Sequence, residues 1–126
     1  MTEEVLKAWG YFHDWSLDSV SVGPNAEPRT LTLGLYIGER RVGVTFSGAT
    51  CVSVKQFGLL NIVYGIHVVA PGDTKHARAS AVLETGERLT HRRAALLVFV
   101  YSTLGAELAI ECDSLEVRET ESGPVL

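Results

Sequence analysis

The stretch Leu31–Phe46 has the sequence LTLGLYIGERRVGVTF and alternates apolar with polar or small residues on both sides of Gly38-Glu39. A period of two on either side of a Gly-X pair is typical of a β-hairpin whose glycine opens a type II′ turn. A two-residue loop fixes the register of the two strands. The cross-strand pairs in that register are Ile37 with Arg40, Leu35 with Val42, Leu33 with Val44 and Leu31 with Phe46. Three apolar pairs then share one face, which predicts that this face lies on a core.

Similar alternation continues along the chain and predicts strands over residues 16–22, 50–57, 62–69 and 96–101. A final strand over residues 107–117 changes the parity of its apolar positions near Asp113-Ser114, which a β-bulge would explain. Residues 75–84 are ambiguous because their alanines favour a helix while their alternating spacing favours a strand; we predict a strand. Residues 2–9 predict a short helix with Val5, Leu6 and Trp9 on one face.

Short links between these elements imply antiparallel neighbours. The sequence therefore predicts an α+β fold that is mainly β: a short N-terminal helix and a curved antiparallel sheet of about seven strands, forming a small sandwich or partial barrel. We expect residues 1–118 to form a single domain and residues 119–126 to form a flexible C-terminal tail.

The chain has 126 residues, 11 basic and 15 acidic, and a net charge of -4. This balance argues against nucleic acid as a partner, since phosphate binding needs a basic surface. No apolar stretch approaches the ~20 residues that span a bilayer, and no signal peptide precedes the fold, so we expect no membrane partner and a cytoplasmic protein. Cys51 and Cys112 match no metal or redox spacing and are expected to be buried thiols rather than a disulfide.

No catalytic motif is present, and we expect no enzyme activity and no cofactor. The four histidines, His13, His67, His76 and His91, lack the spacing of metal ligands. His13 lies beside Asp14, but adjacent strand residues point in opposite directions, so adjacency does not make an acid–base pair. We expect Asp14 to satisfy backbone N–H groups in a turn while Phe12 and Trp15 pack in the core.

The last predicted strand carries an acidic stripe, formed by Glu107, Glu111 and Asp113 opposite Leu108 and Ile110, with Glu116 following. Two interpretations remain open. The stripe is either a solvated edge that resists aggregation or a docking surface that steers a basic protein partner. Under the second interpretation, Asp14 and these four acidic residues are the candidate partner-binding residues.

Several short motifs resemble the bacterial immunity protein 50 family and related small proteins of unknown function. The motifs that carry the resemblance are Phe12-His13-Asp14, the Leu31-to-Phe46 hairpin, Ser47-Gly48-Ala49-Thr50, Asn61-Ile62-Val63-Tyr64, and Cys112-Asp113-Ser114-Leu115-Glu116-Val117. They span roughly residues 12–118; the alanine-rich segment 77–81 and the Arg92-Arg93 loop depart from the pattern. The resemblance implies a non-enzymatic protein that binds and neutralises a cognate bacterial toxin, which would be a basic domain if the acidic stripe docks on it.

Two other functions compete with this interpretation. The first is a small-ligand-binding β domain, with a pocket lined by Tyr36, Tyr64, His67 and Tyr101. The second is a self-assembling structural subunit joined through an exposed strand edge. The sequence does not decide between a monomer and a homodimer.

Overall fold

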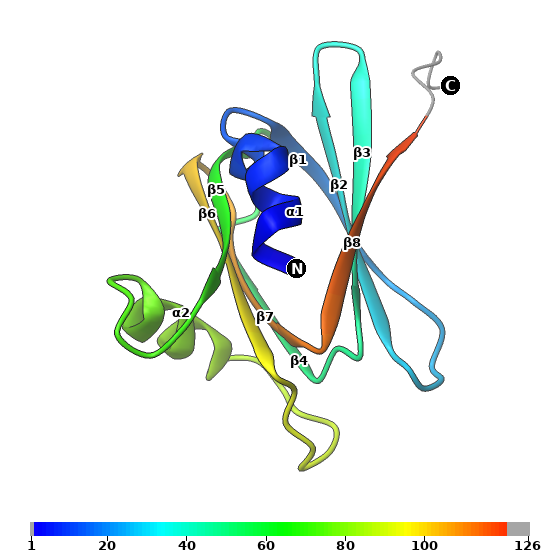
Figure 1. Cartoon of the computed structure of the whole chain (residues 1–126), viewed down its shortest axis with the longest axis vertical. Helices are drawn as coiled ribbons and strands as arrows, with labels where there is room; N and C mark the ends of the chain where they lie inside the picture. The colour runs from blue at the N-terminus through cyan, green and yellow to red at the C-terminus, as the bar shows by residue number, and fades with distance from the viewer. Residues whose placement is uncertain (1, 121–126) are drawn as a thin grey trace.

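The computed structural model describes residues 2–120 and has the predicted α+β, mainly β fold (Figure 1). Eight antiparallel strands form one open sheet in the order β4-β7-β6-β5-β1-β2-β3-β8. The strands are β1 Ser16–Val22, β2 Thr30–Ile37, β3 Arg40–Ser47, β4 Cys51–Lys55, β5 Ile62–Val69, β6 Leu96–Leu104, β7 Glu107–Cys112 and β8 Ser114–Thr120. Two short helices, α1 (Thr2–Ala8) and α2 (His76–Leu83), and a 3₁₀ turn, η1 (Gly10–Phe12), complete the fold. Neither α1 nor α2 has the length and apolar character needed to span a membrane.

The central hairpin has the predicted register. Ile37 lies opposite Arg40, and the apolar pairs follow down to Leu31 and Phe46. Gly38 has φ of +56°, the positive value that the first position of a type II′ turn requires. The inward side chains of both strands are buried, namely Leu31, Leu33, Leu35, Val42, Val44 and Phe46. The hairpin therefore supplies one wall of the core.

The prediction of one bulged strand over residues 107–117 is wrong, because two strands replace it. β7 ends at Cys112 and pairs with β4 and β6, whereas β8 starts at Ser114 and pairs with β3. Asp113 stands between them, with its backbone N–H donated to the carbonyl of Ser47 (2.9 Å). The parity change therefore marks the crossing of the chain to another part of the sheet. β8 also includes Glu119 and Thr120, which we assigned to the tail; residues 121–126 lie outside the described residues.

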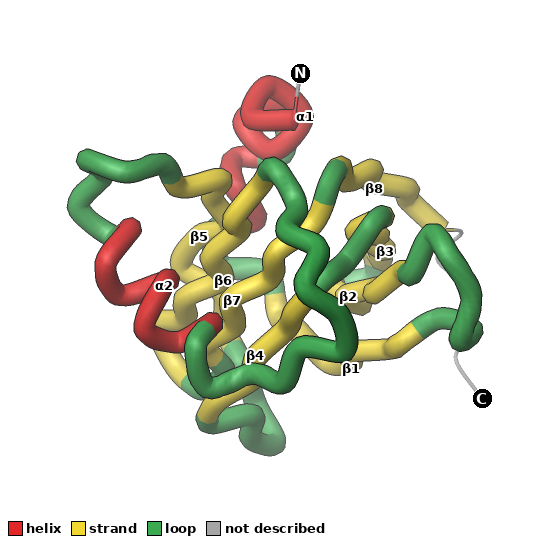
Figure 2. Tube along the Cα trace, turned by 90° about the horizontal axis from the view of Figure 1, so that it is seen from below, coloured by secondary structure: helices red, strands yellow, loops and turns green. Residues whose placement is uncertain are grey.

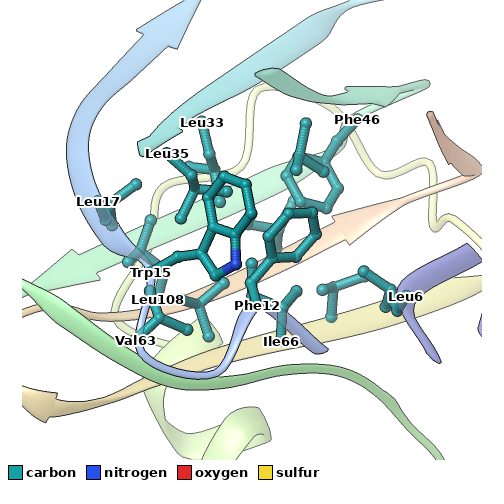
Figure 3. Close-up of a cluster of buried hydrophobic side chains, with 14 of the residues drawn as sticks. Leu6, Phe12, Trp15, Leu17, Leu33, Leu35, Phe46, Val63, Ile66 and Leu108 are labelled. Carbon is teal, nitrogen blue, oxygen red and sulfur yellow. The ribbon is translucent and has the colours of Figure 1, made fainter. Parts of the chain in front are cut away.

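The sheet curves around α1, which contacts both β5 and β8 (Figure 1). Leu6 of this helix is fully buried among side chains from both halves of the sheet (Figure 3). A helix of seven residues is too short to be stable alone, so its stability comes from this packing. The concave interior is thus filled by side chains and leaves the outer surfaces for binding.

A left-handed turn joins α1 to β1. Gly10, Tyr11 and Phe12 all have φ near +60°, a conformation that disfavours non-glycine residues. Burial of Phe12 offsets this cost: its ring stacks on Trp9 at 5.6 Å and meets Trp15 edge-on at 5.3 Å. The predicted packing of Phe12 and Trp15 is confirmed. The guanidinium of Arg40 lies over both tryptophan rings, at 5.3 and 5.6 Å.

Residues 75–84 contain helix α2, so the strand predicted there is wrong. Figure 2 shows α2 on the outer side of the sheet, beside β4–β7. Ala79, Val82 and Leu83 are buried there against a second apolar cluster that includes Phe99 and Ala109. Their spacing of three and four residues places them on one helical face. The alternation of alanines was therefore coincidental, and their helix propensity was the better guide.

The two cysteines are free and buried, as predicted. Cys112 belongs to the inner cluster and Cys51 to the outer cluster beneath α2. Burial raises the pKa of the Cys112 thiol to about 12, which keeps it protonated and unreactive at neutral pH.

Candidate functional site

The predicted exposed acidic stripe does not exist as such, because β7 is an inner strand and α2 packs against it. Glu111 is only 8% exposed and accepts two hydrogen bonds from the guanidinium of Arg88, at 2.8 and 3.0 Å. Thr50 donates its hydroxyl and Ala94 its backbone N–H to the same carboxylate. These donors, the Arg88 guanidinium foremost, lower the pKa of Glu111 to about 2. Glu111 therefore acts as a structural anchor for the loop that carries Arg88.

The other two acidic residues of the predicted stripe, Glu107 and Asp113, also form ion pairs with arginines. Glu107 forms a two-point ion pair with Arg78 of α2. Asp113 is exposed and pairs with Arg92 at 3.1 Å, and Arg92 also donates to the carbonyl of Gly48 at 2.9 Å. The first pair connects α2 to the sheet, and the second connects the loop over residues 84–95 to the sheet. Steering by a bare acidic face is therefore weaker than the sequence suggested.

The other two candidate residues lie apart from these three. Glu116 is exposed on the edge strand β8, with Arg118 at 3.9 Å. Asp14 is exposed beside η1, and its carboxylate lies 3.6 Å from the ring of His13. His13 Nδ1 in turn contacts the carbonyl of Tyr64 at 3.0 Å. The structure therefore does not bring the five predicted residues together, and their role in binding a partner stays a prediction.

Three of the four predicted pocket residues do come together, but they form a surface row of rings. Tyr101 lies between Tyr64, at 5.6 Å between ring centres, and His67, at 5.8 Å. Tyr11 stacks on His67 at 4.3 Å, and the ammonium of Lys75 lies 4.4 Å from the Tyr101 ring centre. Burial lowers the pKa of His67, which favours the neutral ring at pH 7. Tyr36 lies elsewhere, with Arg41 over its ring.

A cavity of about 580 Å³ lies between α2, the loop after it and the β6–β7 face. Its volume falls in the range typical of small-molecule sites. The lining residues are His76, Ser80, Leu83, Glu84, Gly86, Arg88, Arg93, Leu97 and Glu111. None of them is among the four residues predicted to line a pocket. Within residues 2–120, no group of three His, Cys, Asp or Glu side chains could hold a metal ion.

An apolar loop that was not predicted from the sequence links β4 to β5. Leu59 is fully exposed, and Phe57 and Leu60 are 45% and 48% exposed. We call residues 57–60 the apolar loop. Exposed apolar side chains gathered in one loop mark binding surfaces more often than isolated ones do. Two consecutive leucines between the strands predicted over residues 50–57 and 62–69 were the available signal, because turns usually carry polar residues.

Asn61 holds this loop in place from beneath. Its side chain is buried; its carbonyl oxygen accepts hydrogen bonds from the backbone N–H groups of Gly58 (2.9 Å) and Ala106 (3.0 Å). Its amide nitrogen donates to the carbonyls of Leu17 (3.2 Å) and Gly58 (3.0 Å). The loop therefore presents its apolar side chains in a fixed geometry, which lowers the entropic cost of binding.

An open groove of about 370 Å³ lies next to the loop, lined by Asp18, Ser19 and Val20 of β1 together with Val54 and Phe57. β4 forms one end of the sheet, and β1 has a single residue pair with β5, Ser16 with Ile62. Both strands bordering the groove therefore carry backbone that the described sheet leaves unpaired. Together, the apolar loop and the groove form the best-defined candidate site for a protein partner.

No family model matches this chain, and no curated protein or solved structure shows significant similarity to it.

Proposed function

We propose that this chain is a non-enzymatic protein-binding module of the immunity type, which acts by covering a cognate bacterial toxin. The observation that carries the proposal is the apolar loop, which the buried Asn61 holds rigid. Affinity at protein interfaces is concentrated in a few well-placed side chains that exclude water. The short-motif resemblance to immunity proteins supplies the toxin as partner, and the two free thiols agree with a cytoplasmic location.

The mode of binding follows from the chemistry of this surface. Phe57, Leu59 and Leu60 offer apolar contacts, while the neighbouring groove offers unpaired strand backbone. A toxin segment that docks here would bury these side chains and add main-chain hydrogen bonds along β1 or β4. Because the acidic residues of β7 are already paired, we expect little of the affinity to come from long-range charge attraction.

The first test is capture of the partner with tagged protein from a lysate of the source organism, washed at low and at high salt. We expect one stoichiometric partner that remains bound at high salt, since apolar contacts are not screened. Expression of that partner alone should be toxic, and co-expression with this chain should restore growth. A captured partner that is harmless to cells would contradict the immunity role.

A matched pair of substitutions tests the docking surface. Leu59→Asp should weaken binding of the captured partner at least about tenfold without lowering thermal stability, because Leu59 makes no buried contact. Leu89→Asp is the control, since Leu89 is also an exposed leucine in a loop, at 73% exposure. Equal binding by both variants, measured by titration calorimetry, would place the docking surface elsewhere.

The cavity beside α2 favours a second candidate function, the binding of a small anionic molecule. Arg93 lines it without an ion pair in the described chain, and His76 and Ser80 provide further donors. Glu84 lines the same cavity, so a ligand that carries a positive group as well as a negative one would also fit. We expect phosphate or a small carboxylate to raise the melting temperature of the protein, and Arg93→Ala to abolish that shift. An identical shift in the variant would exclude the cavity as the binding site.

A further inference from the structure

We propose that strand β8 pairs in antiparallel fashion with the β8 of a second copy, around a two-fold axis through Val117, and so joins two sheets into a homodimer. This surface lies at the end of the sheet opposite to β4 and the apolar loop. The inference is therefore independent of the proposed toxin-binding function, and dimerisation leaves that loop available.

Strand β8 lies at one end of the sheet. The strand pairs with β3 along its whole length, from Ser114 opposite Ser47 to Thr120 opposite Arg41, with no register shift. In the described chain, no strand pairs with its other side. Sheet edges are usually protected by a proline, a bulge, charged side chains, or a covering helix or loop. β8 has no proline and no bulge, although it carries charged side chains and α1 contacts it. Figure 1 shows it as a continuous strand at the margin of the sheet.

The outer face of β8 carries two exposed charges of opposite sign. Glu116 and Arg118 are 66% and 78% exposed, and they approach each other only to 3.9 Å along the same strand. Their neighbours on β3 offer them no charge, because Arg118 lies opposite Gly43 and Glu116 lies opposite Thr45. The hydroxyl of Thr45 is itself bonded to Thr32 at 3.0 Å. Both charges are therefore available to a partner strand.

Only one register of β8 against a second β8 pairs both charges with opposite charges. A two-fold axis perpendicular to the sheet places outer-face residues of one copy opposite outer-face residues of the other. Because side chains alternate between the two faces, the allowed registers of the two β8 strands differ from one another by two residues. An axis through Val117 places Glu116 directly opposite Arg118 of the second copy, twice by symmetry, and pairs all seven residues of β8. An axis through Glu116 or Arg118 would place that residue opposite itself, and like charges directly opposite are destabilising. Charge complementarity thus selects the self-pairing around Val117.

Charge reversal tests this geometry. Analytical ultracentrifugation of the wild type should show a reversible, concentration-dependent dimer. Arg118→Glu or Glu116→Arg alone should weaken dimerisation about tenfold, since each places like charges at two symmetric positions. The double variant E116R/R118E should restore wild-type dimerisation, because it exchanges the charges and keeps the pairing. Glu87→Arg makes the same charge change as Glu116→Arg at an exposed loop position away from β8 and should have no effect.

Hydrogen exchange gives a second readout that needs no variant. Backbone N–H groups of β8 that point away from β3 should exchange more slowly as the protein concentration rises through the dimerisation range. A wild type that stays monomeric at millimolar concentration would overturn the proposal. So would a dimer that the single reversals leave unchanged, a double variant that fails to recover, or concentration-dependent protection confined to strands other than β8.

Discussion

Replacing Glu111 by alanine should lower the free energy of unfolding by about 3 kcal/mol. The substitution leaves the guanidinium of Arg88, only 23% exposed, without its carboxylate. Breaking a buried ion pair by removing one partner typically costs 3 to 5 kcal/mol, and the partial exposure of Arg88 places this case at the lower end. The substitution of Glu111 also removes the hydrogen-bond acceptor for the hydroxyl of Thr50 and for the backbone N–H of Ala94. Urea unfolding at pH 7 measures the difference.

The same residue predicts how stability depends on pH. The folded-state pKa of Glu111 is about 2, against 4.5 for the free side chain. A lowered folded-state pKa stabilises the protein above the unfolded-state pKa, and this stabilisation is lost as pH falls from about 4.5 towards 2. The shift corresponds to about 3 kcal/mol at neutral pH. We expect the Glu111→Ala variant to lose most of this pH dependence.

Glu119→Ala provides the matched control. Glu119 also forms a two-point ion pair, with Arg40 at 2.9 and 3.1 Å, but both side chains are largely exposed. Exposed pairs contribute little to stability, so this variant should unfold close to the wild type. If both variants lost the same stability, burial would not be the reason for the importance of Glu111.

Asn61→Ala should produce a loss of similar size, about 3 kcal/mol, and should also weaken partner binding. The substitution leaves two N–H groups and two carbonyls without their partners, at Gly58, Ala106 and Leu17. An unsatisfied buried polar group costs about 1 to 3 kcal/mol, and groups that reach water after relaxation cost less. The apolar loop would lose its fixed geometry, and binding would then have to order it.

The control for this variant is Asn25→Ala. Asn25 lies in an exposed loop and hydrogen-bonds to the side chain of Arg29. Its removal leaves no buried group unpaired, so unfolding in urea should change little. A small effect of Asn61→Ala on unfolding, together with normal partner binding, would show that the loop keeps its shape without the asparagine.

The local fold was predictable wherever a short-range pattern decided it. The register of β2 and β3 follows from one Gly-X pair and the alternation around it, both of which lie within sixteen consecutive residues. The helix at residues 76–83 was missed because alanines at alternating positions are compatible with a helix and with a strand. Only the packing against Phe99 and Ala109 decides between the two. The division into β7 and β8 was missed for a similar reason, because pairing with distant strands decides it.

The candidate site was less predictable than the fold. Charge counting identified Glu107 and Glu111 but could not show that Arg78 and Arg88, far away in the sequence, neutralise them. The apolar loop depends on Asn61, whose partners include Leu17 and Ala106, 44 and 45 residues distant in the chain. Such contacts arise only once the whole sheet has formed, and a local sequence pattern does not contain them.

The position of α1 has a consequence for synthesis of the protein. α1 is synthesised before all of the strands, yet it contacts β8, which includes residues up to Thr120. Its apolar face, including Leu6, is therefore not fully covered until β8 has been synthesised. We expect shortened chains that lack residues 114–120 to expose this face and to recruit chaperones or aggregate. Completion of β8 is thus the step that closes the core.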